Sequence, residues 1–344
     1  MYKGTGISKD QLSDDGEPCI LYGELYTKYK SETIREVISK TNIDNTKLVR
    51  SKANDVIIPC SGETAEDIAT ARCVLNGNIL LGGDLNIIRL HGYDGAFMSY
   101  QLNGRRKYDI AKVAQGVSVV HLYGEHLKGV KTINPCLEEQ KKIAKLLSLL
   151  DERIATQNKI IDKLQSLIKG IAQKIVHSNK PNVCLSECLE CKTSTLQESD
   201  VCEHGVYPVY GANGIVGYLD NYNTEGEAVY IIKDGSGVGT VSYVTGKCSA
   251  TGTLNTLQAK EGYSLQYLYY LLKVFNFEPY KTGMAIPHIY FKDYGKAKVF
   301  CPSYTEQLRY ARLLSAIDNK LSIEQNILTE LRLQKQYLLR QMFI

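Results

Sequence analysis

A long helical segment occurs twice in this chain of 344 residues, and the two copies lie 167 positions apart. The first reads "NPCLEEQKKIAKLLSLLDERIATQNKIIDKL" and the second "CPSYTEQLRYARLLSAIDNKLSIEQNILTEL". Across 115–177 and 282–344 there are 14 identities in 63 positions without a gap. A repeat of this length determines the architecture before any single motif does. The recurring residues are Pro135, Glu139, Gln140, Ala144, Leu147 and Asp151, matched by Pro302, Glu306, Gln307, Ala311, Leu314 and Asp318.

The repetition extends upstream of the helices. Gly116, His121 and Tyr123 recur at the same offset, and "GEPCILYGELYTKY" resembles "GVYPVYGANGIVGY". Aligning the two Tyr-Gly pairs places Met1 opposite Leu189, so we expect the first domain to be N-terminally incomplete. The predicted organisation is a first globular domain at 1–135, a central helix at 136–177, a second globular domain at 178–301 and a C-terminal helix at 302–344.

Apolar residues in both helical segments recur at steps that alternate between four and three, which is the seam of a coiled coil. We expect the two helices to pack antiparallel, with the globular domains at opposite ends and related by a pseudo-two-fold axis. The alternative is that each helix packs only on its own domain. A polar residue interrupts each seam at matched positions and can set register. The predicted seam residues are Leu147, Leu150, Ile154, Gln157, Ile161, Leu164, Leu314, Ile317, Leu321, Glu324, Leu328 and Leu331.

The globular segments contain short β-rich runs such as "DVIIPC", "LNIIRL", "AVYIIK" and "GTVSYV", separated by Gly and Asn turns, with a helical candidate at 264–275. This pattern predicts an α+β fold. The Gly-rich "IIKDGSGVGT" does not have the order of a P-loop and runs on into a strand, so we interpret it as a hairpin turn.

Composition limits the class of protein. Apolar residues make up 44% and charged residues 23%, the net charge is +4, and the basic excess lies in the two helical segments. No apolar run reaches the length of a membrane span. The first residues lack the pattern of a secretory signal, and the ten cysteines are then expected to be reduced thiols. These features predict a cytoplasmic protein.

The repeated Pro-x-x-x-Glu-Gln ahead of a Leu-rich helix, together with "GGDLNIIRL", "AQGVSVVHLY", "VYGANGIVGY" and "GMAIPHIYFKDYGKAKVFCP", resembles the specificity subunit of type I restriction–modification systems. The resemblance covers nearly the whole chain. It implies two target recognition domains, each reading half of a bipartite duplex DNA sequence, and a coiled coil that sets the spacer. It further implies no catalysis in this chain. Two adenine methyltransferase subunits and the motor-nuclease subunits would be its partners, and S-adenosylmethionine, ATP and Mg²⁺ are expected only there.

Candidate DNA contacts are basic, aromatic and amide side chains. Residues 178–301 contain no arginine, so that domain cannot make the bidentate arginine–guanine contact. We expect Lys, Asn, Gln, Ser and Thr to read its half-site, with Asn213 or Asn255 as candidates. The two repeated histidines lack a nearby nucleophile or carboxylate pattern and are more simply core or turn residues. The DNA-binding candidates are Arg105, Arg106, Lys107, Lys112, His121, Tyr123, Asn213, Lys281, His288, Tyr290 and Lys292.

One cysteine cluster has metal-like spacing, namely Cys188, Cys191, Cys202 and His204, with Cys184 beside them. The alternative is that "VCLSECLECK" is a helix with buried cysteines, and we therefore expect no zinc. No catalytic constellation was found. The competing hypothesis to DNA recognition is a coiled-coil adaptor whose two domains bind proteins.

Overall fold

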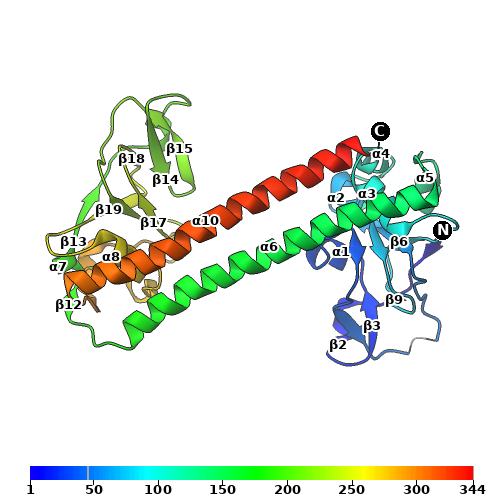
Figure 1. Ribbon diagram of the computed structural model, residues 1–344, viewed down its shortest axis with the longest axis horizontal. Coiled ribbons are helices and arrows are strands. Elements are labelled where there is room, and N and C mark those ends of the chain that lie inside the picture. The colour runs from blue at the N-terminus through cyan, green and yellow to red at the C-terminus, as the bar shows by residue number, and fades with distance from the viewer. Residues whose placement is uncertain (45, 344) are drawn as a thin grey trace. The chain divides into compact units, whose positions relative to one another are not determined.

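The computed structural model describes residues 1–44 and 46–343, which form two compact units. Unit 1 comprises Met1–Asn158 together with the chain from Asn326 onward, and unit 2 comprises Lys159–Gln325. Two long helices, α6 (Leu137–His177) and α10 (Tyr304–Gln341), each belong in part to both units (Figure 1). The boundary follows residue 158 in α6 and residue 325 in α10, positions that again differ by 167.

Unit 1 is built on a five-stranded sheet, and β6 at its centre is buried throughout. Val56 and Ile58 pack toward the helices, while Ile57 packs with the second sheet, as the two-residue period of a strand requires. In order across the sheet, the strands are β1 (Tyr2–Lys3), β10 (Leu85–Ile88), β6 (Asp55–Pro59), β8 (Arg72–Val74) and β4 (Thr33–Ile34).

The second sheet of unit 1 supports the Tyr-Gly segment, and a short pair of strands lies apart from it. The second sheet consists of β2 (Leu12–Ser13), β5 (Ser39–Thr41), β3 (Glu17–Ile20) and β9 (Leu80–Leu81); the pair is β11 (Val120–His121) with β7 (Ser61–Gly62). The helices are α1 (Glu24–Thr27), α2 (Ala65–Ile68), α3 (Gly95–Asn103), α4 (Lys107–Lys112) and α5 (Gly124–Lys128), with a 3-10 turn at Lys9–Gln11.

Unit 2 repeats this plan. Its strand β14 pairs antiparallel with β15 and parallel with β18, as β3 does with β5 and β9. The antiparallel pair β16–β19 corresponds to β6–β10. The four-stranded sheet is β13 (Leu189–Thr193), β19 (Leu254–Ala259), β16 (Ala228–Ile232) and β17 (Val241–Val244), and the three-stranded sheet is β15 (Gly214–Leu219), β14 (Tyr207–Gly211) and β18 (Ser249–Ala250).

The antiparallel pairing of β16 with β17 confirms that "IIKDGSGVGT" connects two strands of a hairpin. The predicted helix at 264–275 is α8. The remaining elements of unit 2 are β12 (Val183–Cys184), which pairs with β20 (Lys298–Val299), and the helices α7 (Leu185–Cys188), α8 (Leu265–Leu272) and α9 (Phe291–Tyr294), with 3-10 turns at Glu198–Asp200 and Glu278–Tyr280.

The helical interpretation of "VCLSECLECK" was wrong for most of its length. Only α7 is helical, and the chain continues directly into β13, where Cys191 lies opposite Leu257 of β19. Backbone hydrogen bonds to β19 stabilise β13 as a strand. These bonds join parts of the chain that are distant in sequence. Local apolar spacing does not reveal such a pairing.

Within unit 1 the start of α6 and the end of α10 pack antiparallel. Phe343 packs with Ala144 and Leu147, and Arg332, earlier in α10, donates to Asn158, later in α6, at 3.5 Å. In unit 2, side chains of both helices line one cavity. The predicted seam residues Leu147, Gln157, Ile161, Leu314, Leu321, Glu324, Leu328 and Leu331 are buried, and Leu150, Ile154, Leu164 and Ile317 are half-buried. Among the described residues, no helix has the length and apolar character needed to cross a bilayer.

Candidate nucleic-acid interface

The repeated glutamines anchor each globular domain to its long helix. The Oε1 of Gln140 accepts from the backbone N–H of Asp94 at 2.9 Å, and its Nε2 donates to the carbonyl of Pro135 at 2.7 Å. Gln307 makes the same two contacts, with the N–H of Ser264 at 2.9 Å and the carbonyl of Pro302 at 2.9 Å. Both glutamines are buried, so each satisfies two backbone groups that would otherwise lose their hydration.

The residues bound by these glutamines begin the helices that cover the sheets. Asp94 is the N-cap of α3, and its side chain accepts from the N–H of Phe97 at 2.8 Å. Ser264 caps α8 in the same way, accepting from Tyr267 at 3.3 Å. The Pro-x-x-x-Glu-Gln motif therefore links the start of a long helix to the start of a domain helix.

The repeated aspartates make a second contact between each long helix and its domain helix. Tyr100 of α3 donates its hydroxyl to Asp151 at 2.7 Å, and Tyr270 of α8 donates to Asp318 at 3.2 Å. Burial, reinforced by the nearby carboxylate charge, raises the pKa of both tyrosines. Both hydroxyls therefore remain protonated donors.

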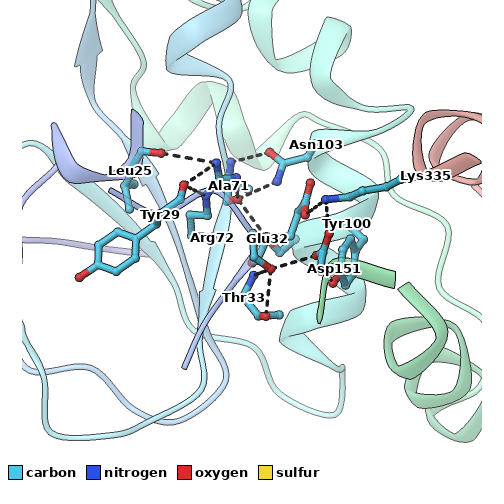
Figure 2. Close-up of polar contacts among 12 residues, drawn as sticks. Leu25, Tyr29, Glu32, Thr33, Ala71, Arg72, Tyr100, Asn103, Asp151 and Lys335 are labelled. Carbon is cyan, nitrogen blue, oxygen red and sulfur yellow. Dashed lines mark hydrogen bonds and ion pairs between the residues drawn. The ribbon is translucent and has the colours of Figure 1, made fainter. Parts of the chain in front are cut away.

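In unit 1 the aspartate anchor also contains a buried lysine (Figure 2). The Nζ of Lys335, from α10, lies 2.6 Å from Asp151 and 2.5 Å from Glu32, and Ser31 donates to Asp151 at 2.9 Å. All three charged side chains are at most 14% exposed. We call Lys335, Glu32 and Asp151 the lysine cluster. It ties the end of α10 to both α6 and the globular domain of unit 1.

The lysine cluster holds two carboxylates against one ammonium. Burial raises the pKa of Glu32, and the charge of Asp151 acts in the same direction, while Lys335 opposes both. Arg72 lies nearby, and its guanidinium donates to the backbone carbonyls of Tyr29 at 3.1 Å and Ala71 at 3.0 Å (Figure 2). The guanidinium thus holds the chain that precedes Glu32 against β8.

Two equivalent loops carry several of the predicted DNA contacts. Gln115 and His121 exchange backbone hydrogen bonds of 2.9 and 2.7 Å, and Thr282 and His288 do the same at 2.8 and 2.7 Å. Each loop turns through a glycine with positive φ, and a Cβ on Gly283 would lie 2.3 Å from a carbonyl oxygen. The repeated Gly-to-His spacing is explained by this closed turn.

In unit 2 the loop brings four candidates onto one segment. His288, Tyr290 and Lys292 occupy alternate positions at the end of the loop and just after it, and Lys281 precedes the loop. The Nζ of Lys292 lies 5.3 Å from the ring centroid of Tyr290. Lys281 is paired with Glu278 at 2.6 Å, so part of its charge is neutralised. Asn213 is exposed in the turn between β14 and β15, which is a separate loop.

His288 has a carboxylate partner that sequence proximity did not indicate. Its Nδ1 lies 2.6 Å from Asp234, which belongs to the β16–β17 hairpin. The expectation that this histidine lacks a nearby carboxylate was therefore wrong. Asn255 is also unsuited to base contact, because it is buried in β19 and donates to the hydroxyl of Tyr294 at 3.1 Å.

In unit 1 the candidates fall on two segments. His121 and Tyr123 are exposed, and their rings stack with centroids 6.3 Å apart. Arg105, Arg106, Lys107 and Lys112 belong to the α3–α4 turn and α4, where Arg106 pairs with Asp109 at 3.3 Å and Lys112 lies over Tyr108. Gly104 packs against Leu339 of α10, so this basic segment begins beside the end of that helix.

The cysteines do not assemble into a metal site within the described residues. Cys188 is buried with its Sγ 3.8 Å from that of Cys301, and Cys184 lies beside it on β12. Cys191 lies on β13, and Cys202 and His204 are exposed. Burial raises the pKa of the Cys191 thiol to about 11, which favours the neutral thiol over a thiolate ligand.

Several residues that organise the site were missed at the level of sequence. Tyr100 and Tyr270 do not share the offset of 167, because they differ by 170, so the gapless comparison did not pair them. Lys335 is a polar residue at a seam position of α10, and the sequence around it does not indicate its two carboxylate partners. A comparison that allowed a gap between α3 and α6 could have found the tyrosines.

Comparison with known proteins identifies a family for this chain. A profile of the family described as "Type I restriction modification DNA specificity domain" matches residues 3–166 and 178–333. The chain is 28% identical over 116 residues to the Type I restriction enzyme EcoprrI specificity subunit of Escherichia coli, covering 34% of this chain and 29% of that protein. It is 28% identical over 155 residues to the Type I restriction enzyme MjaVIII specificity subunit of Methanocaldococcus jannaschii, covering 45% and 35%.

These sequence matches span about a third of the length of each of the two relatives. A crystal structure of a Type-I restriction-modification system S subunit from M. genitalium matches over the whole chain. The TM-score is 0.70 at 20% identity, with 100% of this chain and 93% of that chain covered. This likeness concerns the fold.

Proposed function

Because the chain belongs to the type I restriction–modification DNA specificity family, we propose that it is the subunit that recognises target DNA in such a system. The observation that supports this most directly is the duplication. Each unit attaches the same two-sheet domain to a long helix through the same glutamine and aspartate contacts. Two equivalent domains on helical supports suit a target with two half-sites, because half-site spacing follows protein geometry.

In this proposal each recognition domain reads one half of a bipartite sequence. The helices α6 and α10 set the number of base pairs between the halves. The buried seam residues support this role, since two helices that pack along their length form a stiffer spacer than either alone.

The proposed complex contains two adenine methyltransferase subunits, and motor-nuclease subunits join it for cleavage. This chain supplies recognition and no catalytic group. S-adenosylmethionine and the ATP and Mg²⁺ used for cleavage belong to those partner subunits. The near-neutral recognition domains favour such sharing, because a protein that binds DNA alone usually carries a stronger basic patch.

We propose that the unit 2 half-site is contacted by the segment from Lys281 to Lys292 and by the β14–β15 turn with Asn213. Tyr290, Lys292 and Asn213 are exposed, and Lys281 and His288 are half-buried. Together they offer ammonium, imidazole, phenol and amide groups. The lack of arginine between 178 and 301 leaves these groups to read bases and phosphates. In unit 1 the corresponding candidates are His121 and Tyr123, with the basic α3–α4 segment as a further surface.

Co-expression with the methyltransferase subunit of the same system, followed by methylation-sensitive long-read sequencing, tests the proposal. We expect an adenine-methylated motif split into two halves by a spacer of fixed length. Deletion of this chain should abolish the methylation.

A continuous motif, or methylation that survives the deletion, would contradict DNA recognition by this chain. A gel shift with the reconstituted complex that shows no dependence on DNA sequence would instead favour the adaptor hypothesis.

A further inference from the structure

The two units differ at one seam position beside the anchoring aspartates. Lys335 of α10 reaches Asp151 in unit 1. The residue 167 positions earlier, on α6 in unit 2, is Ile168. Its side chain is buried and lies on the wall shared with Asp318, the counterpart of Asp151. An isoleucine cannot supply the positive charge that Lys335 supplies in unit 1.

Asp318 lines a cavity. Its volume is about 430 Å³, and its wall includes Tyr270, whose hydroxyl donates to Asp318. Within the described residues, Asp318 forms no ion pair of the kind that Asp151 forms with Lys335. The other residues of the wall come from α6, from α8 and its C-terminal end, and from α10: Gln165, Lys169, Ala172, Lys273, Val274, Leu321, Ser322 and Gln325.

We propose that this cavity receives a lysine or arginine side chain of the methyltransferase subunit, which pairs with Asp318 as Lys335 pairs with Asp151. The proposal rests on the proposed function for the existence of that partner. Its chemistry comes from unit 1, where the same aspartate–tyrosine pair is completed by an ammonium. The cavity of about 430 Å³ is large enough for a lysine or arginine side chain. A long side chain displaces only several water molecules, and each takes about 30 Å³ in the liquid.

The other charges at the cavity specify the partner further. Lys273 lies 5.1 Å over the ring of Tyr269, which is not part of the wall, and Lys169 is exposed on α6. These two lysines of the wall favour a carboxylate next to the incoming basic side chain. The matching surface is therefore a basic residue flanked by an acidic one.

Binding of the purified full-length chain to the purified methyltransferase subunit tests this inference. The affinity is measured by calorimetry for the unaltered chain and for Asp318→Asn, which keeps an acceptor for Tyr270 but removes the charge. We expect this variant to bind at least about tenfold more weakly, as when one partner of a buried charge pair is lost. Asp220→Asn, at an exposed carboxylate outside the cavity wall, is the matched control and should bind normally.

Ile168→Lys gives an independent test that does not remove the aspartate. The new ammonium should occupy the place that Lys335 holds in unit 1 and exclude the partner's side chain. We expect weaker binding with an unchanged or higher melting temperature.

Normal affinity in both Asp318→Asn and Ile168→Lys would overturn the inference, and the proposed function would stand as long as the methylome still depends on this chain. If the unaltered chain does not bind the methyltransferase and methylation persists without it, the proposed function itself fails.

Discussion

At the scale of single residues, the lysine cluster of unit 1 is a site where the loss of one side chain should strongly lower the free energy of unfolding. One ammonium faces two carboxylates in a site that is almost closed to solvent. A buried charge left without its partner is far more costly than the intact pair is stabilising. The cluster therefore specifies where the end of α10 docks, whatever its net contribution to stability.

Replacing Lys335 by methionine should destabilise unit 1 by about 3–5 kcal/mol, because Glu32 and Asp151 remain buried without a cation. Urea unfolding followed by circular dichroism measures the loss. Lys163→Met is the matched control, since Lys163 is exposed on α6, and it should change stability little. Equal stability of the two variants would show that the cluster does not hold the helix end.

The raised pKa of Glu32 predicts a pH dependence of stability. The folded chain keeps the Glu32 proton to higher pH than the unfolded chain, whose glutamate titrates near the ordinary value of 4.5. The contribution of this proton is fully present below 4.5 and is lost as pH rises through the folded pKa. Stability should therefore fall across that window.

Glu32→Gln should reduce that fall, because glutamine does not titrate. Melting temperatures measured from pH 4 upward for both proteins give the comparison. Parallel curves for the variant and the unaltered chain would assign the pH dependence to other groups.

At the scale of elements, the repeated motif joins one helix end to another. Gln140 and Gln307 each connect the first turn of a long helix with the cap of a domain helix. The same geometry in both units explains why glutamine and proline recur together. An exposed glutamine on a helix would not need a fixed proline five residues earlier.

Gln307→Ala should cost about 1–3 kcal/mol, because the buried N–H of Ser264 and the carbonyl of Pro302 lose their partner. Hydrogen exchange should show the loss locally, at the start of α8. Gln334→Ala, at an exposed position of α10, serves as the control. Unchanged protection of α8 would mean that the glutamine is not the anchor.

At the scale of the whole molecule, the proposed function makes the long helices a spacer between half-sites. Seven residues added to both helices, after positions 158 and 325, preserve the seam period and lengthen each helix by ~10.5 Å. We expect methylated half-sites of unchanged sequence with a spacer longer by up to about three base pairs.

The control adds seven residues to α6 alone, which puts the two seams out of register and should abolish assembly. A methylome with an unchanged spacer after the double insertion would show that helix length does not set the spacing of the half-sites.

The sequence by itself determined that the chain contains two copies of one domain, each followed by a long helix with a coiled-coil seam. Those features are local or periodic, so they can be counted from residue order, and Gln140 and Asp151 stood out because they recur at one offset. The tertiary structure alone decided what these residues touch. Lys335 meets Glu32 across 303 positions and His288 meets Asp234 across 54, and such pairs depend on the path of the chain through space. The same reason placed the Cys191 segment in a strand and buried Asn255.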